Sequence, residues 1–98
     1  MTTLSTHVLD TGSGRPASGV PVRLLRGDEV LAQGVTDADG RIGDLGDVQH
    51  GSYRLEFDTS AHSDFFPLVE IAFVVGDDRH HHVPLLLSPF AYSTYRGS

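Results

Sequence analysis

The sequence contains no cysteine and no tryptophan. Without thiols, disulfide bonds and thiolate chemistry are excluded, and residue usage says nothing about a redox compartment. With 98 residues, the chain has room for a single domain, residues 1–98, with a modest core. A core of this size leaves apolar surface uncovered, and oligomerisation is an attractive way to bury it.

Basic residues are also few. Seven Lys and Arg stand against thirteen Asp and Glu, which gives a formal net charge of −6. Nucleic acid is not an expected partner, because binding to phosphates needs a basic face and the basic residues here are scattered. No long apolar run predicts a membrane span, and MTTLSTHVLD lacks the basic and apolar regions of a signal peptide. The expected location is the cytoplasm.

Sustained helical periodicity is absent as well. Short apolar and β-branched runs alternate with Gly, Pro and Asp clusters, the pattern of a β-sandwich or barrel. The expected strands are 4–10, 20–26, 29–36, 52–58, 66–75, 80–87 and 90–96, with room for one short strand within 42–51. Residues 59–64 carry helix-capping side chains but suffice for a turn or two only. The sequence thus predicts an all-β domain of seven or eight strands with at most one short helix.

Side-chain alternation assigns a face to each strand residue. In the first strand, Leu4 and Val8 share one face, while Ser5 and His7 share the other. The residues expected to point inward from two later strands are Val20, Val22, Leu24, Tyr53, Leu55 and Phe57.

Three consecutive histidines open strand 80–87. Alternation puts His80 and His82 on one face and His81 on the other. Two imidazoles at this spacing, with His7 as a third ligand, form a candidate zinc site. Structural zinc generally needs four ligands and often cysteine, so the sequence predicts neither a bound metal nor another cofactor.

Other polar residues have both a structural and a functional interpretation. His7 occupies a polar strand position that histidine also fills for structural reasons alone. Arg41 follows the turn 37–40, where a solvated arginine is ordinary, but its forked donors also suit the oxygens of a substrate. The terminal segment 95–98 either frays into solvent or lines a pocket with its hydroxyls.

Three blocks of the sequence resemble the 5-hydroxyisourate hydrolases, the transthyretin-related enzymes of purine breakdown. They are LSTHVLDTGSGRPASGVPVRL (4–24), TDADGR (36–41) and HHHVPLLLSPFAYSTYRGS (80–98), and they cover about half the chain in the family's order. The resemblance implies a transthyretin-like β-sandwich of two sheets. It also implies an enzyme without a cofactor, assembled as a homotetramer with sites at the dimer–dimer interface.

The resemblance further implies roles for individual residues. The family's catalytic residues map onto His7, Arg41 and His82. The implied substrate-binding residues are His80, Tyr95, Arg96 and Ser98. The implied reaction is hydrolysis of the cyclic amide of 5-hydroxyisourate to 2-oxo-4-hydroxy-4-carboxy-5-ureidoimidazoline in urate catabolism. Which histidine is the general base and which the acid stays open.

The chain departs from the family pattern in three places. His81 stands where the family has tyrosine, and segments 41–51 and 58–65 are shorter than usual. Altered loops rather than an altered site are expected from the two short segments, whereas His81 bears on the fine-tuning for substrate more than on the reaction class. Two alternatives remain: a non-catalytic transthyretin-like protein that binds a small ligand, and a metal-binding sandwich based on the histidines. The paired histidines and the YRGS ending, which transthyretin lacks, argue against the first.

Overall fold

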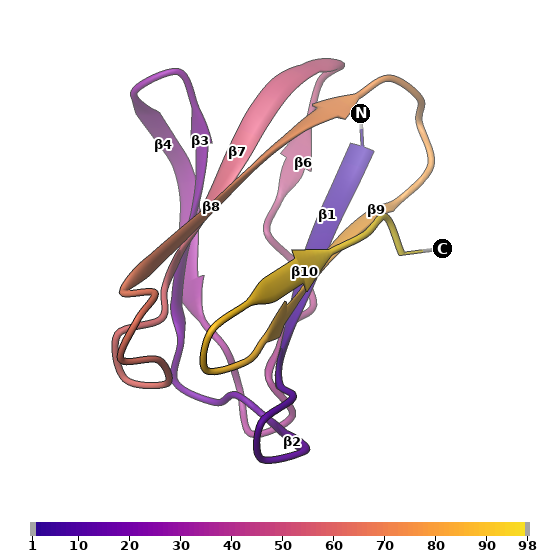
Figure 1. The fold of residues 1–98 in the computed structure, drawn as a ribbon. Helices are drawn as coiled ribbons and strands as arrows, with labels where there is room; N and C mark the ends of the chain where they lie inside the picture. Colours follow the sequence, from indigo (N-terminus) through magenta and orange to yellow (C-terminus); the bar gives the residue numbers. More distant parts are fainter. Residues whose placement is uncertain (1, 98) are drawn as a thin grey trace.

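The computed structural model describes residues 2–97 as two packed β-sheets (Figure 1). The first sheet has the order β10 (Tyr92–Thr94), β9 (His81–Leu87), β1 (Thr2–Asp10) and β2 (Arg15–Pro16), and β5 (Arg41–Ile42) and β6 (Asp47–Val48) also pair with β1. The second sheet has the order β4 (Glu29–Val35), β3 (Pro21–Arg26), β7 (Gly51–Asp58) and β8 (Leu68–Val75). Residues 2–97 contain no helix, and therefore none that could cross a membrane. The predicted all-β sandwich is confirmed.

The strand boundaries differ from the prediction mainly in the short elements. Three of the ten strands within residues 2–97 have two residues each, and β2 lies between the expected strands 4–10 and 20–26, where no strand was predicted. A two-residue ladder leaves no alternation to detect, so pattern alone misses it. Residues 59–64 form a turn, in which the amides of His62 and Ser63 both donate to the carbonyl oxygen of Thr59 at 2.9 Å.

The core between the sheets matches the predicted alternation. Six residues of β7, β3 and the position before β3 were predicted to point inward. All of them are at most 4% exposed: Val20, Val22, Leu24, Tyr53, Leu55 and Phe57. Leu4 and Val8 of β1 and Leu85 of β9 face them from the other sheet and are equally buried. Burying one such side chain stabilises the fold by about 1.5–3 kcal/mol. The core thus fixes which face of β1 is left for other tasks.

The pairing of β1 with β9 positions the site. These two strands run parallel, whereas the other strand pairs within residues 2–97 are antiparallel. Ser5 is in register with His82, and His7 with Pro84. Since residues in register share a face, and Leu4 faces the core, Ser5, His7 and His82 all lie on the outer face of the first sheet.

Candidate functional site

A tight turn built by Asp37 delivers Arg41 to this outer face. The Asp37 carboxylate accepts hydrogen bonds from the amides of Asp39 at 2.9 Å and Arg41 at 3.0 Å. Gly40 has φ of 73°, and a Cβ there would lie 2.4 Å from a backbone oxygen of β1. Only glycine fits such a position. The turn is therefore held against β1, with Arg41 directly opposite His7 in the β1–β5 pair.

The same turn orients His7. Its Nε2 donates to the carbonyl oxygen of Asp39 at 2.9 Å. Because a carbonyl can only accept, neutral His7 carries its proton on Nε2 and keeps a lone pair on Nδ1. The side chain is half-buried. His7 thus offers Nδ1 as a proton acceptor beside Arg41.

His82 is joined to His80 through the hydroxyl of Ser5. The Ser5 Oγ lies 2.8 Å from His82 Nδ1 and 2.7 Å from His80 Nε2. On its other side, His80 Nδ1 lies 2.6 Å from the Oγ1 of Thr3. These contacts fix both rings and leave His82 Nε2 as the nitrogen available to a substrate.

The surroundings of His82 disfavour its charged form. Partial burial lowers the pKa of His82 below the ordinary value of 6.5, and the charges of Arg41, His7 and His80 lower the pKa further. The strand register and the Ser5 hydrogen bonds place the same groups on this face. The ring is therefore neutral near neutral pH and able to accept a proton.

The C-terminal segment is anchored against the same histidine. The amide of Gly97 donates to the carbonyl oxygen of His82 at 2.8 Å. A Cβ on Gly97 would lie only 2.6 Å from Cδ2 of the His82 ring. Glycine at this position is what lets the chain pass so close to the imidazole.

The side chains of two other predicted substrate-binding residues, Arg96 and Tyr95, make their contacts elsewhere. Arg96 is paired with Asp77, with 3.1 Å between its guanidinium and the carboxylate. Tyr95 is 59% exposed and lines a cleft of about 290 Å³ beside β8, away from the histidine cluster. Ser98 lies outside the described residues. The assignment of these three to substrate binding stays a prediction.

His81 points to the opposite side of β9, as alternation predicted. It is 3% exposed, and its Nδ1 donates to the carbonyl oxygen of Arg79 at 2.7 Å. Its buried Nε2 has no hydrogen-bond partner within residues 2–97. His81 is thus separated from the cluster by the sheet itself.

The metal-binding alternative gains no support from the geometry. In the described part of the chain, no group of three His, Cys, Asp or Glu side chains is placed to hold a metal ion. Both nitrogens of His80 and the Nδ1 of His82 are instead directed at hydroxyl groups.

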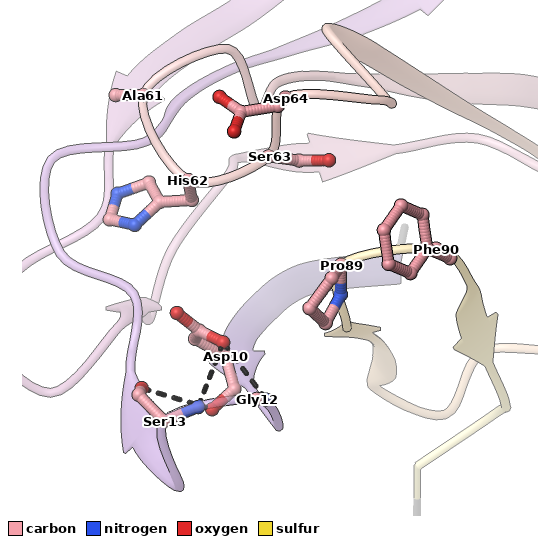
Figure 2. Close-up of a pocket in the computed structure, with 9 residues that line it drawn as sticks. All are labelled: Asp10, Gly12, Ser13, Ala61, His62, Ser63, Asp64, Pro89 and Phe90. Carbon is pink, nitrogen blue, oxygen red and sulfur yellow. Dashed lines mark hydrogen bonds between the residues drawn. The ribbon is translucent and has the colours of Figure 1, made fainter.

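A separate cleft of about 500 Å³ lies at one end of the sandwich, between three loops (Figure 2). Its lining residues are Asp10, Gly12, Ser13, Ala61, His62, Ser63, Asp64, Pro89 and Phe90. The Asp10 carboxylate accepts from the amides of Gly12 and Ser13, and His62 donates to the carbonyl oxygen of Ser18 at 3.0 Å. These polar groups hold the loops together, and none of the predicted site residues lines the cleft.

Comparison with known proteins places the chain in a family. The model of the HIUase/Transthyretin family matches residues 4–97. The chain belongs to the HIUase/transthyretin family. Within it, the chain is 48% identical to the 5-hydroxyisourate hydrolase of Caulobacter vibrioides, over 100% of both chains. It is 41% identical to that of Mus musculus, over 97% of this chain and 94% of the mouse protein.

Solved structures of family members share the fold. The 5-hydroxyisourate hydrolase of Klebsiella pneumoniae matches with a TM-score of 0.91 and 45% identity over 100% of both chains. Sea bream transthyretin, solved in complex with thyroxine, matches with a TM-score of 0.86 and 34% identity, over 96% of this chain and 93% of that one. Because one fold carries both a hydrolase and a ligand-binding protein, the outer-face residues must decide between these functions.

The comparison also shows that this chain is shorter than the Caulobacter relative. The Caulobacter relative aligns over 115 positions, although this chain has 98 residues. The relative therefore carries residues that this chain lacks, and their assignment to segments 41–51 and 58–65 stays a prediction. In this shorter chain, Arg41 still pairs with His7, and His82 lies on the same face of the sheet.

Sequence reasoning did not assign a role to Ser5 or Thr3. Both share the face of His7 by alternation, and this spacing is the signal that could have drawn attention to them. Their contact with His80 and His82 depends on the parallel register of β1 and β9, which the sequence pattern does not reveal.

Proposed function

We propose that the protein hydrolyses the cyclic amide of 5-hydroxyisourate to 2-oxo-4-hydroxy-4-carboxy-5-ureidoimidazoline in urate degradation. The observation that carries this proposal is the meeting of His7, Arg41 and His82 on one face, from three separate strands. The full-length similarity to 5-hydroxyisourate hydrolases supports the same reaction.

Amide hydrolysis sets three tasks. Water needs a base, the developing oxyanion needs a donor, and the leaving ring nitrogen needs an acid. The Nδ1 of His7 and the Nε2 of His82 are the two nitrogens available for the proton transfers. The Arg41 guanidinium stays charged at any working pH and stabilises the oxyanion. Each proton-transfer group contributes about a hundred- to ten-thousand-fold in rate.

The assembly that completes this site is part of the proposal. Arg41 and His80 are exposed, so the outer face is open in a single chain. An open face leaves the reaction in bulk water, where electrostatic stabilisation is weak. A homotetramer in which the outer faces of two dimers cover each other would enclose the substrate. A cytoplasmic location also stays part of the proposal.

The decay of freshly generated 5-hydroxyisourate tests the proposed reaction. The protein should accelerate the decay, and the acceleration should survive a chelator. Acceleration that the chelator abolishes would favour the metal-binding alternative instead. No acceleration by folded protein would contradict the proposal and leave the ligand-binding alternative.

A further inference from the structure

The hydroxyl of Ser5 lies between two imidazoles. It is 2.8 Å from His82 Nδ1 and 2.7 Å from His80 Nε2, and the other nitrogen of His80 is 2.6 Å from Thr3 Oγ1. All three distances are within hydrogen-bond range, so the four side chains form one continuous hydrogen-bonded relay. A hydroxyl has a single proton to donate, so Ser5 accepts from one imidazole and donates to the other.

This hydrogen-bonded relay has two self-consistent proton arrangements. In the first, His82 Nδ1–H donates to Ser5, Ser5 donates to His80 Nε2, and His80 Nδ1–H donates to Thr3. His82 Nε2 then has a free lone pair. In the second, every donor and acceptor is reversed and His82 Nε2 carries the proton. Both arrangements are neutral. The relay can therefore switch His82 Nε2 between a lone pair and a proton without moving net charge.

The two imidazoles of the relay differ in their surroundings. Ser5 is 7% exposed and His82 is half-buried beside Arg41 and His7, whereas His80 is exposed. A positive charge is therefore disfavoured on His82 and solvated on His80. A proton that arrives at His82 is therefore favoured to move through Ser5 toward His80.

We propose that His80 temporarily stores the proton that His82 takes from the attacking water, and that Ser5 bridges the transfer; the inference rests on the hydrolysis proposed above. As the water oxygen bonds to the carbonyl carbon, its proton moves to His82 Nε2. The Nδ1 proton of His82 moves to Ser5 Oγ, and the Ser5 proton moves to His80 Nε2. His82 is again neutral, and His80 is an imidazolium whose Nδ1–H still faces Thr3.

The return of the same protons closes the cycle. When the ring C–N bond breaks, His80 returns its Nε2 proton to Ser5, Ser5 returns a proton to His82 Nδ1, and His82 Nε2–H protonates the leaving nitrogen. No proton is gained or lost. Ser5 and His80 are thus positioning residues that act through His82.

Replacement of Ser5 tests the bridge. Ser5→Ala should lower kcat about tenfold or more while KM changes less than about twofold, because proton transfer rather than binding is impaired. Ser5→Thr keeps the hydroxyl and should retain most of the activity. Ser93→Ala, on the exposed strand β10, is the matched control and should behave as the wild type.

Replacement of His80 tests whether this residue holds the proton. Because the side chain is exposed, its replacement should leave the packing of the fold unchanged. His80→Gln can hydrogen-bond but cannot hold a proton, so kcat should fall with little change in KM. His50→Gln, at another exposed histidine, is the control. A rise in KM with unchanged kcat would show that His80 only binds substrate and would overturn the inference.

The ¹⁵N NMR signals of His82 give a readout that needs no turnover. A Ser5→Ala variant should change the balance of Nδ1–H and Nε2–H tautomers of His82, and Ser93→Ala should not. Unchanged tautomers together with an unchanged kcat in Ser5→Ala would overturn the bridge. A folded wild-type protein without hydrolase activity would instead overturn the proposed function, and with it the proposal that His80 stores a proton.

Discussion

His7 and His82 are both half-buried imidazoles, yet their partners constrain them differently. His7 donates to a carbonyl oxygen, which cannot donate in return, so its tautomer is fixed. His82 shares a hydroxyl with His80, and a hydroxyl can reverse its role. The reversible imidazole can take a proton and later return it, whereas the fixed tautomer of His7 keeps its Nδ1 as an acceptor.

Replacement of His82 should remove both proton transfers, since both are proposed to run through its Nε2. His82→Asn is expected to lower kcat at least about a hundredfold, because asparagine cannot accept the proton from water. The measurement is the initial rate of 5-hydroxyisourate decay, with circular dichroism to verify the fold. A folded His82→Asn variant with wild-type turnover would remove His82 from the mechanism.

The pH dependence should follow the lowered pKa of His82. Since burial and then the charge of Arg41 depress this pKa below 6.5, neutral His82 persists below pH 6.5, and activity is lost only as pH falls through the lowered value. NMR titration should show a rise of the His82 pKa in Arg41→Gln. Arg15→Gln, at an exposed arginine, is the control. An Arg41→Gln variant with the wild-type His82 pKa would place Arg41 too far away to act on this ring.

At the residue scale, the sequence predicted the groups with distinctive chemistry and missed those that support them. His7, Arg41 and His82 stand in blocks that resemble a known family. Ser5 is a common residue whose role arises from a contact across 77 positions of sequence. Such a contact follows from strand register, which local patterns do not encode.

Strand β9 separates two histidines with opposite surroundings. His82 reaches the open outer face, whereas neighbouring His81 is 3% exposed in the core. A buried polar atom without a partner costs about 1–3 kcal/mol, and His81 Nε2 has none within residues 2–97. The strand therefore carries a defect on its inner face.

Removal of this defect should stabilise the fold. His81→Phe is expected to raise the free energy of unfolding by about 1 kcal/mol, because the freed carbonyl of exposed Arg79 can bind water. The adjoining cleft of about 290 Å³ gives the larger ring room. Urea denaturation measures the change. Destabilisation by His81→Phe would mean that Nε2 has a partner in the working assembly.

The C-terminal segment should be sensitive to a single methyl group. Gly97→Ala would place Cβ 2.6 Å from His82 Cδ2, so the ring or the segment must shift and kcat should fall about tenfold, as misplaced catalytic groups lose rate steeply. Gly76→Ala, whose Cβ would meet no atom within 4 Å, is the control. Equal kcat for the two variants would show that the exact ring position is unimportant.

At the element scale, the longer strands follow from alternation and the shorter ones do not. Tyr53, Leu55 and Phe57 of β7 alternate cleanly and are buried as predicted. The two-residue strands β2, β5 and β6 exist because they pair with β1. Their own residues carry too few positions for any periodicity to appear.

At the scale of the whole molecule, the two sheets separate structure from chemistry. The core lies between the sheets, and the histidine cluster lies on the outer face of one of them. Because this face is open, the site of a single chain is incomplete under the proposed tetrameric assembly.

Dilution should therefore reduce specific activity. As tetramers dissociate, activity per chain is expected to fall in parallel with the tetramer fraction, because water enters the site. Analytical ultracentrifugation gives the assembly state, and substrate decay at the same concentrations gives the activity. Constant specific activity down to a demonstrated monomer would contradict a shared site.

The ring of His82 is held by a side chain, the hydroxyl of Ser5. The ring of His7 is instead supported by the main chain, through the carbonyl oxygen of Asp39. The side chain at position 39 takes no part in this support, so mutation can change it freely during evolution. Asp37 and Gly40, which shape the backbone of the turn, have no such freedom. Natural variation around the site should concentrate where only peptide groups make the contact.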